Sequence, residues 1–393
     1  MFTFLTNCRK KLRALFMPIC AVALAACEPI GGGLGSIGGP SLDAGAPVPV
    51  ALLVPRGGSG GDAILADNLE RAARLAIRDL DGVSVDLRVY STAGNADVAA
   101  QVATQAVSEG AKIILGPVYG EAANAAGVAV SGDGVNVLSF SNNPTIAGGN
   151  VYVLGPTFDN TANRLVGYAR RQGRDRIVVV HAQDVAGQLG RDAITRAISA
   201  NRAALAGTVD YALSQEAVVS SVPRVKAAVD ASGANAVFLT TSSASALPLL
   251  SQLLPEAGVN PASTQFIGLT RWDIPPQTLS LPGVQGGWFA LPDPGATAAF
   301  RQKFTEAYGQ APHPLAGLAF DGIAAIGALA QRGQSNALSA AALSQGAGFR
   351  GASGIFRLRR DGTNERGLAV ATIRNQQVEI LEGAPQAFGG AGF

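Results

Sequence analysis

The stretch VPVALLVPRGGSGGDAILADNLERAARLAIRDL (48–80) decides the fold class. Its first seven residues form an apolar run that is typical of a strand buried in a parallel sheet. Residues 63–80 then place leucine and alanine at helical spacing, with charged residues between them. The alternation of strand and helix continues along the chain, which predicts a doubly wound parallel sheet. The further strands expected in this first run are 83–90, 112–115 and 135–139, and the further helices are 97–109 and 121–131.

A second run of strand–helix units follows, and the chain then ends in a different pattern. The strands expected in the second run are 176–180, 206–211, 236–239 and 264–267, and the helices are 162–172, 190–200, 222–231 and 247–254. An extended segment at 288–291 and helices at 296–308 and 316–331 come next. Strands expected at 354–358, 368–374 and 378–381 are separated by turn residues, which predicts a closing antiparallel meander. We therefore expect an α/β fold with two doubly wound parallel-sheet lobes.

The first 26 residues have the pattern of an export signal rather than of a folded element. A basic segment (9–13) precedes an apolar run of 13 residues (14–26), which is too short to span a membrane as a helix. The junction Leu24-Ala25-Ala26-Cys27 resembles a bacterial lipobox, and this resemblance implies a lipid on Cys27 after cleavage. The alternative is an ordinary signal peptide in which Cys27 is incidental. Glu28 after the cysteine resembles the sorting signal for the outer membrane, and the Gly- and Pro-rich residues 27–47 read as a tether.

Charge and cysteine content exclude several function classes. Charged residues make up 15% of the chain, below the ~25% of an average protein. Four of the 30 cations and none of the 28 anions lie before Cys27, so cleavage there leaves a net charge of about −2. This balance argues against a nucleic-acid partner. Cleavage would also leave Cys27 as the one remaining cysteine, and the two histidines, His181 and His313, are far apart, so we expect neither a metal site nor a disulfide.

No known catalytic arrangement stands out, and we expect neither enzymatic activity nor a cofactor. The Gly-x-Ser-x-Gly motif of the α/β-hydrolases is absent. Residues 58–63 fit the dinucleotide-binding pattern, but that site also needs an acidic residue at the end of the second strand. That strand ends in Tyr90-Ser91-Thr92, so we favour a glycine-rich loop with Asp62 near the start of the helix.

In order and spacing, six segments resemble the type I periplasmic-binding fold of the leucine-binding-protein-like group. This resemblance implies two lobes that close over a ligand, joined by a hinge of three crossings. The first lobe is then 48–155 plus 292–347, the second is 156–291 plus 348–382, and 383–393 is a flexible tail. The segments that carry the resemblance are 51–62, 71–80, 112–130, 137–145, 314–329 and 349–362.

Within this group, the lipobox and residues 270–294 look most like activator lipoproteins of penicillin-binding proteins. Such activators can carry a helical-repeat domain ahead of this fold, and this sequence has no such segment.

A ligand is expected where parallel strands end, since ligands of open α/β sheets bind beyond the carboxyl ends of the strands. In amino-acid-binding relatives, a serine-rich turn and a helix start hold the ligand's carboxylate, and an acid in the second lobe holds its ammonium. The resemblance carries these roles only in part, because Gly120 stands at the usual serine position and Arg271 near the usual acid. Arg271 suggests an anionic group on the ligand, and Trp272 a flat or sugar-like face. The ligand-binding candidates are Tyr119, Gly120, Ser139, Ser141, Asn142, Arg271 and Trp272, with loop capping or core packing as the alternative for each.

Two functions follow from the resemblance. The first is a non-catalytic solute-binding lipoprotein that binds an amino acid or another small polar solute and hands it to an ABC permease. The second is a regulator of a peptidoglycan synthase that acts by protein contact or binds a cell-wall fragment. In both cases we expect the protein at the periplasmic face of the envelope, attached to the outer membrane by its lipid.

Overall fold

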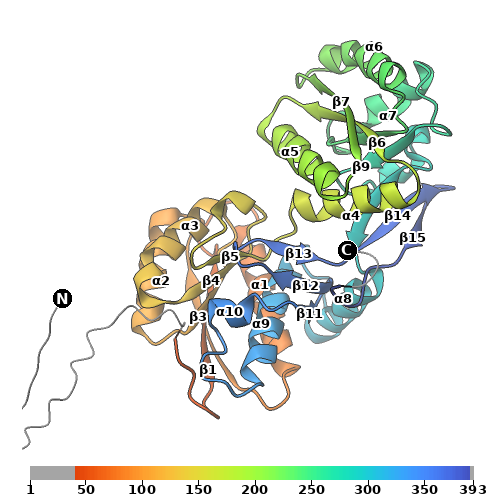
Figure 1. Cartoon of the computed structure of the whole chain (residues 1–393). Helices are drawn as coiled ribbons and strands as arrows, with labels where there is room; N and C mark the ends of the chain where they lie inside the picture. The colour runs from red at the N-terminus through yellow and green to blue at the C-terminus, as the bar shows by residue number, and fades with distance from the viewer. Residues whose placement is uncertain (1–39, 390–393) are drawn as a thin grey trace, which may run out of the picture. The chain divides into compact units, whose positions relative to one another are not determined.

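The computed structural model describes residues 40–389, in which two large sheets and one small sheet are covered by helices (Figure 1). The first sheet is parallel throughout, in the order β2-β1-β3-β4-β5. Buried aliphatic residues fill its central strands, as the apolar run at 48–54 predicts. Its strands are β1 (Val48–Val54), β2 (Val85–Ser91), β3 (Ile113–Leu115), β4 (Asn136–Ser139) and β5 (Val151–Val153).

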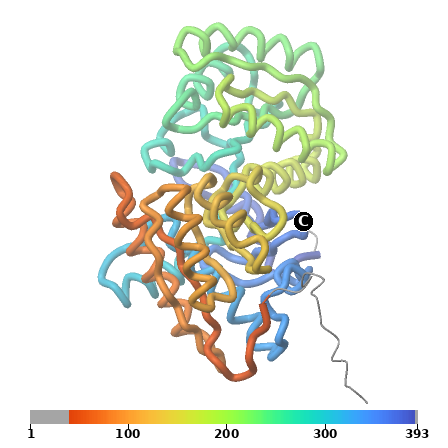
Figure 2. The backbone as a smooth tube through the Cα atoms, turned by 90° about the vertical axis from the view of Figure 1, so that its left-hand side faces the viewer, coloured from red at the N-terminus to blue at the C-terminus, as the bar shows by residue number. Residues whose placement is uncertain are grey.

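Helices cover both faces of this first sheet. On one face, α1 and α9 pack side by side although they are far apart in the sequence, and Figure 2 shows the blue and red ends of the chain in one body. The alanine-rich helices α2 and α3 cover the other face. The helices of this first lobe are α1 (Asp62–Arg78), α2 (Ala96–Ser108), α3 (Gly120–Ala129), α8 (Pro294–Tyr308), α9 (Ala316–Ala330) and α10 (Ala340–Leu343).

The second sheet is mixed, in the order β15-β14-β10-β9-β8-β6-β7. Its parallel part carries α4 and α5 on one face and α6 and α7 on the other (Figure 1). Its strands are β6 (Arg176–Ala182), β7 (Ala204–Tyr211), β8 (Ala236–Leu239), β9 (Gln265–Gly268), β10 (Trp288–Pro292), β14 (Leu368–Arg374) and β15 (Gln377–Glu382). Its helices are α4 (Phe158–Arg171), α5 (Val185–Ala200), α6 (Gln215–Ser232) and α7 (Leu247–Glu256). Single 3-10 turns are η1 (Ser131–Asp133), η2 (Pro144–Ile146), η3 (Pro276–Ser280) and η4 (Pro282–Val284).

The predicted α/β architecture is confirmed. Of the predicted closing meander, the antiparallel pairing of β14 with β15 is confirmed, but the inclusion of the strand before them is wrong. The strands expected at 354–358 and 368–374 belong to different sheets, because β12 (Gly354–Leu358) pairs with β11 (Phe349–Gly351) and β13 (Asn364–Arg366), whereas β14 and β15 join the second sheet. The physical reason is burial: Phe349, Phe356 and Leu358 belong to the apolar core of the first lobe. Residues 349–358 therefore pack with the first lobe and not, as expected, with the second.

Two segments expected to be loose make specific contacts. At the end of the predicted tether, the Leu42 amide donates to the Ser335 carbonyl at 2.8 Å, and the Leu42 side chain packs against the first core. In the predicted tail, Gln386 donates to Asp293 at 2.7 Å, and the Arg357 guanidinium lies 4.5 Å from the centre of the Phe388 ring. Cys27 and the signal segment lie outside the described residues. Within residues 40–389, no helix has the length and hydropathy needed to cross a membrane.

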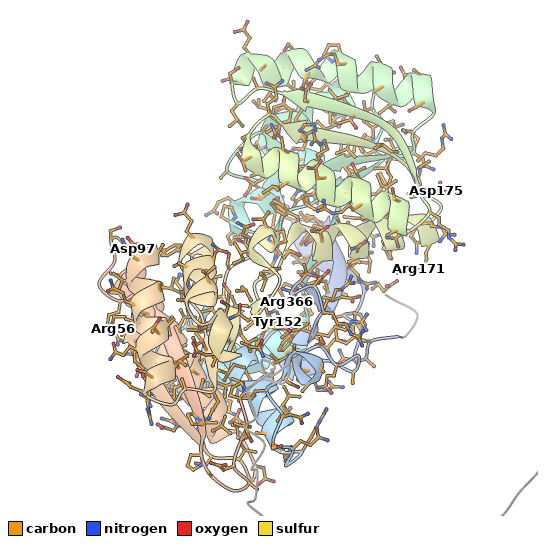
Figure 3. All side chains as sticks on the ribbon, turned by 60° about the vertical axis from the view of Figure 1, so that its left-hand side comes forward. Arg56, Asp97, Tyr152, Arg171, Asp175 and Arg366 are labelled. Atoms are coloured by element: carbon orange, nitrogen blue, oxygen red, sulfur yellow. The ribbon has the colours of Figure 1, made fainter. Side chains whose placement is uncertain are left out.

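Polar side chains hold the crossings between the lobes together. Asn364 donates to the carbonyls of Val153 and Gly155, each at 2.8 Å, at the point where the chain leaves the first sheet. Arg366, labelled in Figure 3, donates to the Leu154 carbonyl at 3.1 Å and to Asp321 at 2.9 Å. Burial raises the pKa of Asp321, while the Arg366 charge opposes this shift. Asp321 is thus a structural residue on α9.

Candidate functional site

Six loops follow the carboxyl ends of parallel strands, three in each lobe. In the first lobe they are residues 56–62, 118–121 and 139–143, and in the second they are 183–187, 240–245 and 270–273. We call them the first-lobe loops and the second-lobe loops. All the ligand-binding candidates named from the sequence lie in these loops or at the end of the strand that precedes them.

Two first-lobe loops are joined by a hydrogen bond between Asp62 and Tyr119. The Tyr119 hydroxyl donates to Asp62 Oδ1, and this bond, helped by burial, raises the pKa of Tyr119. Asp62 begins α1 and is only 8% exposed, whereas Tyr119 precedes α3 and is 41% exposed. The contact depends on Gly58, where an added Cβ would come within 2.1 Å of Asp62 Oδ2. The sequence placed Asp62 at a helix start but gave no signal for a partner 57 residues away.

The serine-rich loop after β4 uses much of its hydrogen-bonding capacity internally. Ser139 is fully buried, donates to the Pro117 carbonyl at 3.1 Å and accepts from the Ser141 amide at 3.1 Å. Ser141 Oγ in turn accepts from the Asn143 amide at 3.1 Å. For Ser139, the structure therefore supports the loop-capping alternative over contact with a ligand.

The same loop lies next to the start of α3, as expected for a shared site. A Cβ added to Gly120 would stand 3.5 Å from Ser141 Oγ and 3.4 Å from Asn143 Nδ2. Asn142 is exposed beside them and makes no side-chain hydrogen bond within the described residues. Tyr119, Gly120, Ser141 and Asn142 are thus gathered in one place, and their backbone and side-chain donors can meet a polar ligand.

In the second lobe, the expectation of a flat Trp272 face for a ligand is wrong. Trp272 has no exposed surface and belongs to the core between the sheet and helices α6 and α7. Its ring fits against two glycines, because a Cβ on either Gly268 or Gly287 would come within 2.2 Å of a ring atom. The sequence could not separate an aromatic residue that packs inward from one that faces solvent, since both occur directly after a strand.

Arg271 has a partner two residues away. Its Nε donates to Asp273 Oδ1 at 2.6 Å, and its Nη2 donates to the other carboxylate oxygen. This two-point geometry is the strong form of an arginine–carboxylate pair. The positive charge that suggested an anionic ligand is therefore already matched by Asp273.

The second-lobe loops also contain polar and apolar groups that packing leaves available. Thr240 is 8% exposed, and its Oγ1 has no hydrogen-bond partner within the described residues. Val185, at the start of α5, is 75% exposed, and Ile274, one residue beyond the loop 270–273, is 55% exposed. Exposed aliphatic side chains of this kind can contact a ligand with an apolar part.

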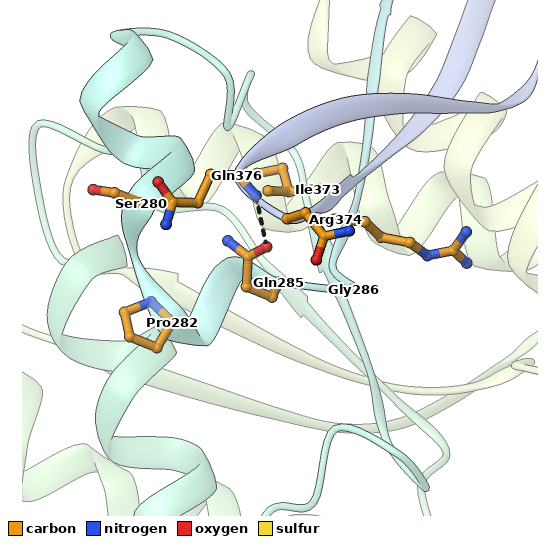
Figure 4. Close-up of a pocket in the computed structure, with 8 residues that line it drawn as sticks. Ser280, Pro282, Gln285, Gly286, Ile373, Arg374 and Gln376 are labelled. Atoms are coloured by element: carbon orange, nitrogen blue, oxygen red, sulfur yellow. Dashed lines mark hydrogen bonds between the residues drawn. The ribbon is translucent and has the colours of Figure 1, made fainter.

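Two pockets elsewhere are less suited to a small ligand. One, of about 500 Å³, lies at the turn between β14 and β15, where the Gln376 amide donates to Gln285 (Figure 4). The other, of about 740 Å³, runs along α4 and α5, and its charged groups are mostly paired, as Arg196 is with Asp159 at 2.9 Å. Within residues 40–389, no cluster of three metal-ligating side chains occurs.

Comparisons with known proteins agree with this architecture. A family model described as "Periplasmic binding protein" matches residues 47–377. A branched-chain amino acid ABC transporter periplasmic ligand-binding protein from Burkholderia xenovorans is 18% identical, with a TM-score of 0.65, and the match covers 88% of this chain and 97% of that one. No curated protein matches significantly.

Two further solved structures contain a ligand. An ABC transporter substrate-binding protein from Desulfitobacterium hafniense, in complex with Leu, is 17% identical with a TM-score of 0.60, over 86% of this chain and 100% of that one. A solute-binding protein from Rhodopseudomonas palustris, in complex with 3,4-dihydroxybenzoic acid, is 15% identical with a TM-score of 0.55, over 86% and 98%. At these identities the likeness concerns the fold.

Proposed function

Because the chain belongs to the periplasmic binding protein family, we propose that it binds a small solute between its two lobes and passes it to an ABC permease. A periplasmic location follows from this family, whose members bind substrates for transporters rather than convert them. The observation that carries the proposal is the gathering of Gly120, Ser141 and Asn142 at the start of α3. A helix start with free backbone N–H groups and nearby polar side chains is suited to holding a polar solute.

The residues that we propose as ligand contacts are those with groups still available. Tyr119 and Asn142 are exposed, and Ser141 keeps its hydroxyl hydrogen for a ligand because its Oγ only accepts within the loop. Arg271 has a positioning role, since it holds the carboxylate of Asp273 in the loop after β9. Ser139 and Trp272 support the fold of their loops from inside.

The test is a thermal-shift screen of the purified protein with amino acids, aromatic acids, amines, sugars, nucleosides and muropeptides. A ligand that binds only the folded state raises Tm as its concentration increases. At a ligand concentration of 100 times Kd, the free energy of unfolding rises by about 2.7 kcal/mol. Asn142→Ala should weaken the binding of any hit. Asn336→Ala, at an exposed asparagine that lines neither pocket, is the matched control and should not. If no compound in the panel raises Tm, the solute-binding proposal fails.

The lipid anchor is a separate proposal that rests on the lipobox resemblance alone. We expect Cys27 to carry the lipid and the protein to be held at the outer membrane, with Glu28 after the cysteine. Labelled palmitate should enter the wild-type protein and not Cys27→Ala, and membrane fractions should give its location. Equal release of both proteins into the periplasm would contradict the anchor.

The predicted role as activator of a peptidoglycan synthase has no observation in its favour. None of the solved structures named above is an activator, and residues 270–294, which suggested that role, contain the buried Trp272 and a paired Arg271.

A further inference from the structure

The charges of the six strand-end loops are unevenly matched. These loops contain four carboxylates, Asp62, Glu121, Asp184 and Asp273, and two cations, Arg56 and Arg271. Both cations are engaged: Arg56 pairs with Asp67 at 2.8 Å and Glu70 at 3.0 Å, and Arg271 pairs with Asp273. The loops therefore carry more carboxylates than cations, and they have no unpaired cation that could bind a ligand's carboxylate.

Asp62 is the carboxylate with the least compensation. It is only 8% exposed, and the one hydrogen bond that its side chain accepts within the described residues comes from the neutral Tyr119 hydroxyl. Within residues 40–389, no group donates to Oδ2 and no arginine or lysine pairs with Asp62. Asp62 Oδ2 is not among the described polar atoms that are both fully buried and without a partner, so it keeps contact with solvent. A cationic donor that reaches this oxygen can form a charge-assisted hydrogen bond.

The surroundings of Asp62 suit the ammonium end of an organic molecule. The Tyr119 ring is joined to Asp62 and partly exposed, and aromatic faces attract alkylammonium groups. The carboxylate and the aromatic ring together match the ammonium group of an organic amine.

The start of α3, by contrast, is poorly suited to a carboxylate. Free N–H groups at a helix start attract anions, but Glu121 lies in the first turn of this helix and Tyr119, which precedes it, is bonded to Asp62. Two carboxylates near one helix start repel a third. The hydroxyl and amide groups of Ser141 and Asn142 remain able to bind a neutral polar group.

We infer that the ligand of this site is an organic amine without a carboxylate, with its ammonium at Asp62 Oδ2, beside the Tyr119 ring. This inference rests on the proposed solute-binding function and narrows it. It also separates the chain from the two structures with ligands named above, since leucine and 3,4-dihydroxybenzoic acid both carry a carboxylate.

The experiment compares amines with the amino acids that share their skeletons. Calorimetric titrations of the protein, expressed from its full sequence, use 3-methylbutylamine against L-leucine, phenethylamine against L-phenylalanine, and agmatine against L-arginine. At least one amine should bind ten-fold or more tightly than its amino acid. Asp62→Asn should raise the Kd of that amine by about 10- to 150-fold, as expected for loss of a charged hydrogen bond. Asp97→Asn, which neutralises the first-turn aspartate of α2, is the matched control and should bind as the wild type does.

Each result supports or overturns the inference. Three results overturn the inference but not the solute-binding function. They are tighter binding of the amino acid than of its amine, binding of carboxylic acids alone, and an amine whose affinity does not change in Asp62→Asn. Absence of any hit in the broad screen removes that function and this inference with it. If Asp62→Asn does not fold, Tyr119→Phe replaces it, because loss of the hydroxyl frees Asp62 and should change the affinity for the amine several-fold.

Discussion

Two buried aspartates differ in how many partners their carboxylates have. Asp321 lies at the crossings between the lobes, and Asp62 lies in a strand-end loop. Asp321 is 1% exposed, accepts from the Ala352 amide at 2.7 Å and pairs with Arg366 at 2.9 Å. Asp62 is 8% exposed and accepts one hydrogen bond from a neutral phenol. A carboxylate that supports the fold is fully matched inside the protein, whereas one left half-matched has capacity for something from outside.

The largest expected effect is on the stability of the crossings. Asp321→Ala leaves Arg366 buried without its carboxylate partner, so we expect a loss of about 3–5 kcal/mol in the free energy of unfolding. Asp62→Asn removes a poorly matched buried charge at constant shape, so its cost should stay below about 1 kcal/mol. Urea unfolding followed by circular dichroism measures both.

A surface pair provides the control for this comparison. Asp159→Ala breaks the more exposed pair with Arg196 and should cost no more than about 1 kcal/mol. Equal losses for Asp321→Ala and Asp62→Asn would contradict the division between a structural and a binding aspartate.

A smaller effect tests the packing of Trp272, one of the two aromatic residues that the sequence nominated as ligand contacts. Gly268→Ala would place a methyl group 2.2 Å from Trp272 Nε1, and overpacking a core in this way costs about 1–3 kcal/mol. Gly132→Ala, which has no atom within 4 Å of the added carbon, should leave the free energy of unfolding unchanged to within about 0.5 kcal/mol. Thermal and urea unfolding give the values. A Gly268→Ala protein as stable as the wild type would mean that Trp272 is free to turn outward.

The sequence was sufficient for the architecture because the fold depends on periodicity. Apolar runs such as 48–54 and 236–239 give strands with the predicted bounds, since a strand buried on both faces needs a continuous apolar segment. The predicted meander was wrong in its first strand because three short strands at the end of the chain have the same local pattern whichever sheet they join. Which core receives Phe349 and Phe356 is decided by packing against residues far away in the sequence.

The places of the candidate residues in the fold were predicted, but their contacts were not, for a related reason. Strand ends and helix starts can be located from local pattern, so the sequence placed Gly120, Ser141 and Asn142 in the strand-end loops where the structure has them, and their role in binding stays a prediction. The state of each polar group depends on partners that local pattern does not reveal. Arg271 forms an ion pair with Asp273, and Ser139 donates its hydroxyl hydrogen to the Pro117 carbonyl. Asp62 accepts a hydrogen bond from Tyr119, which lies in another loop.

The smallest expected effect concerns a partly buried polar group, His313, which is stabilised as the neutral ring. Burial lowers the pKa of His313, and its Nδ1 accepts a hydrogen bond from the Leu315 amide at 3.2 Å, which the protonated ring could not do. Because the pKa in the folded state lies below the unfolded value of 6.5, the neutral ring contributes stability above pH 6.5. That contribution is lost as the pH falls through the folded value.

We therefore expect Tm to fall modestly between pH 7.5 and pH 5.5, a window in which few carboxylates titrate. His313→Asn keeps a side-chain acceptor at this position without a titrating group, so its Tm should change less over the same interval. If the wild type and His313→Asn lose Tm in parallel, the acid sensitivity does not arise from His313.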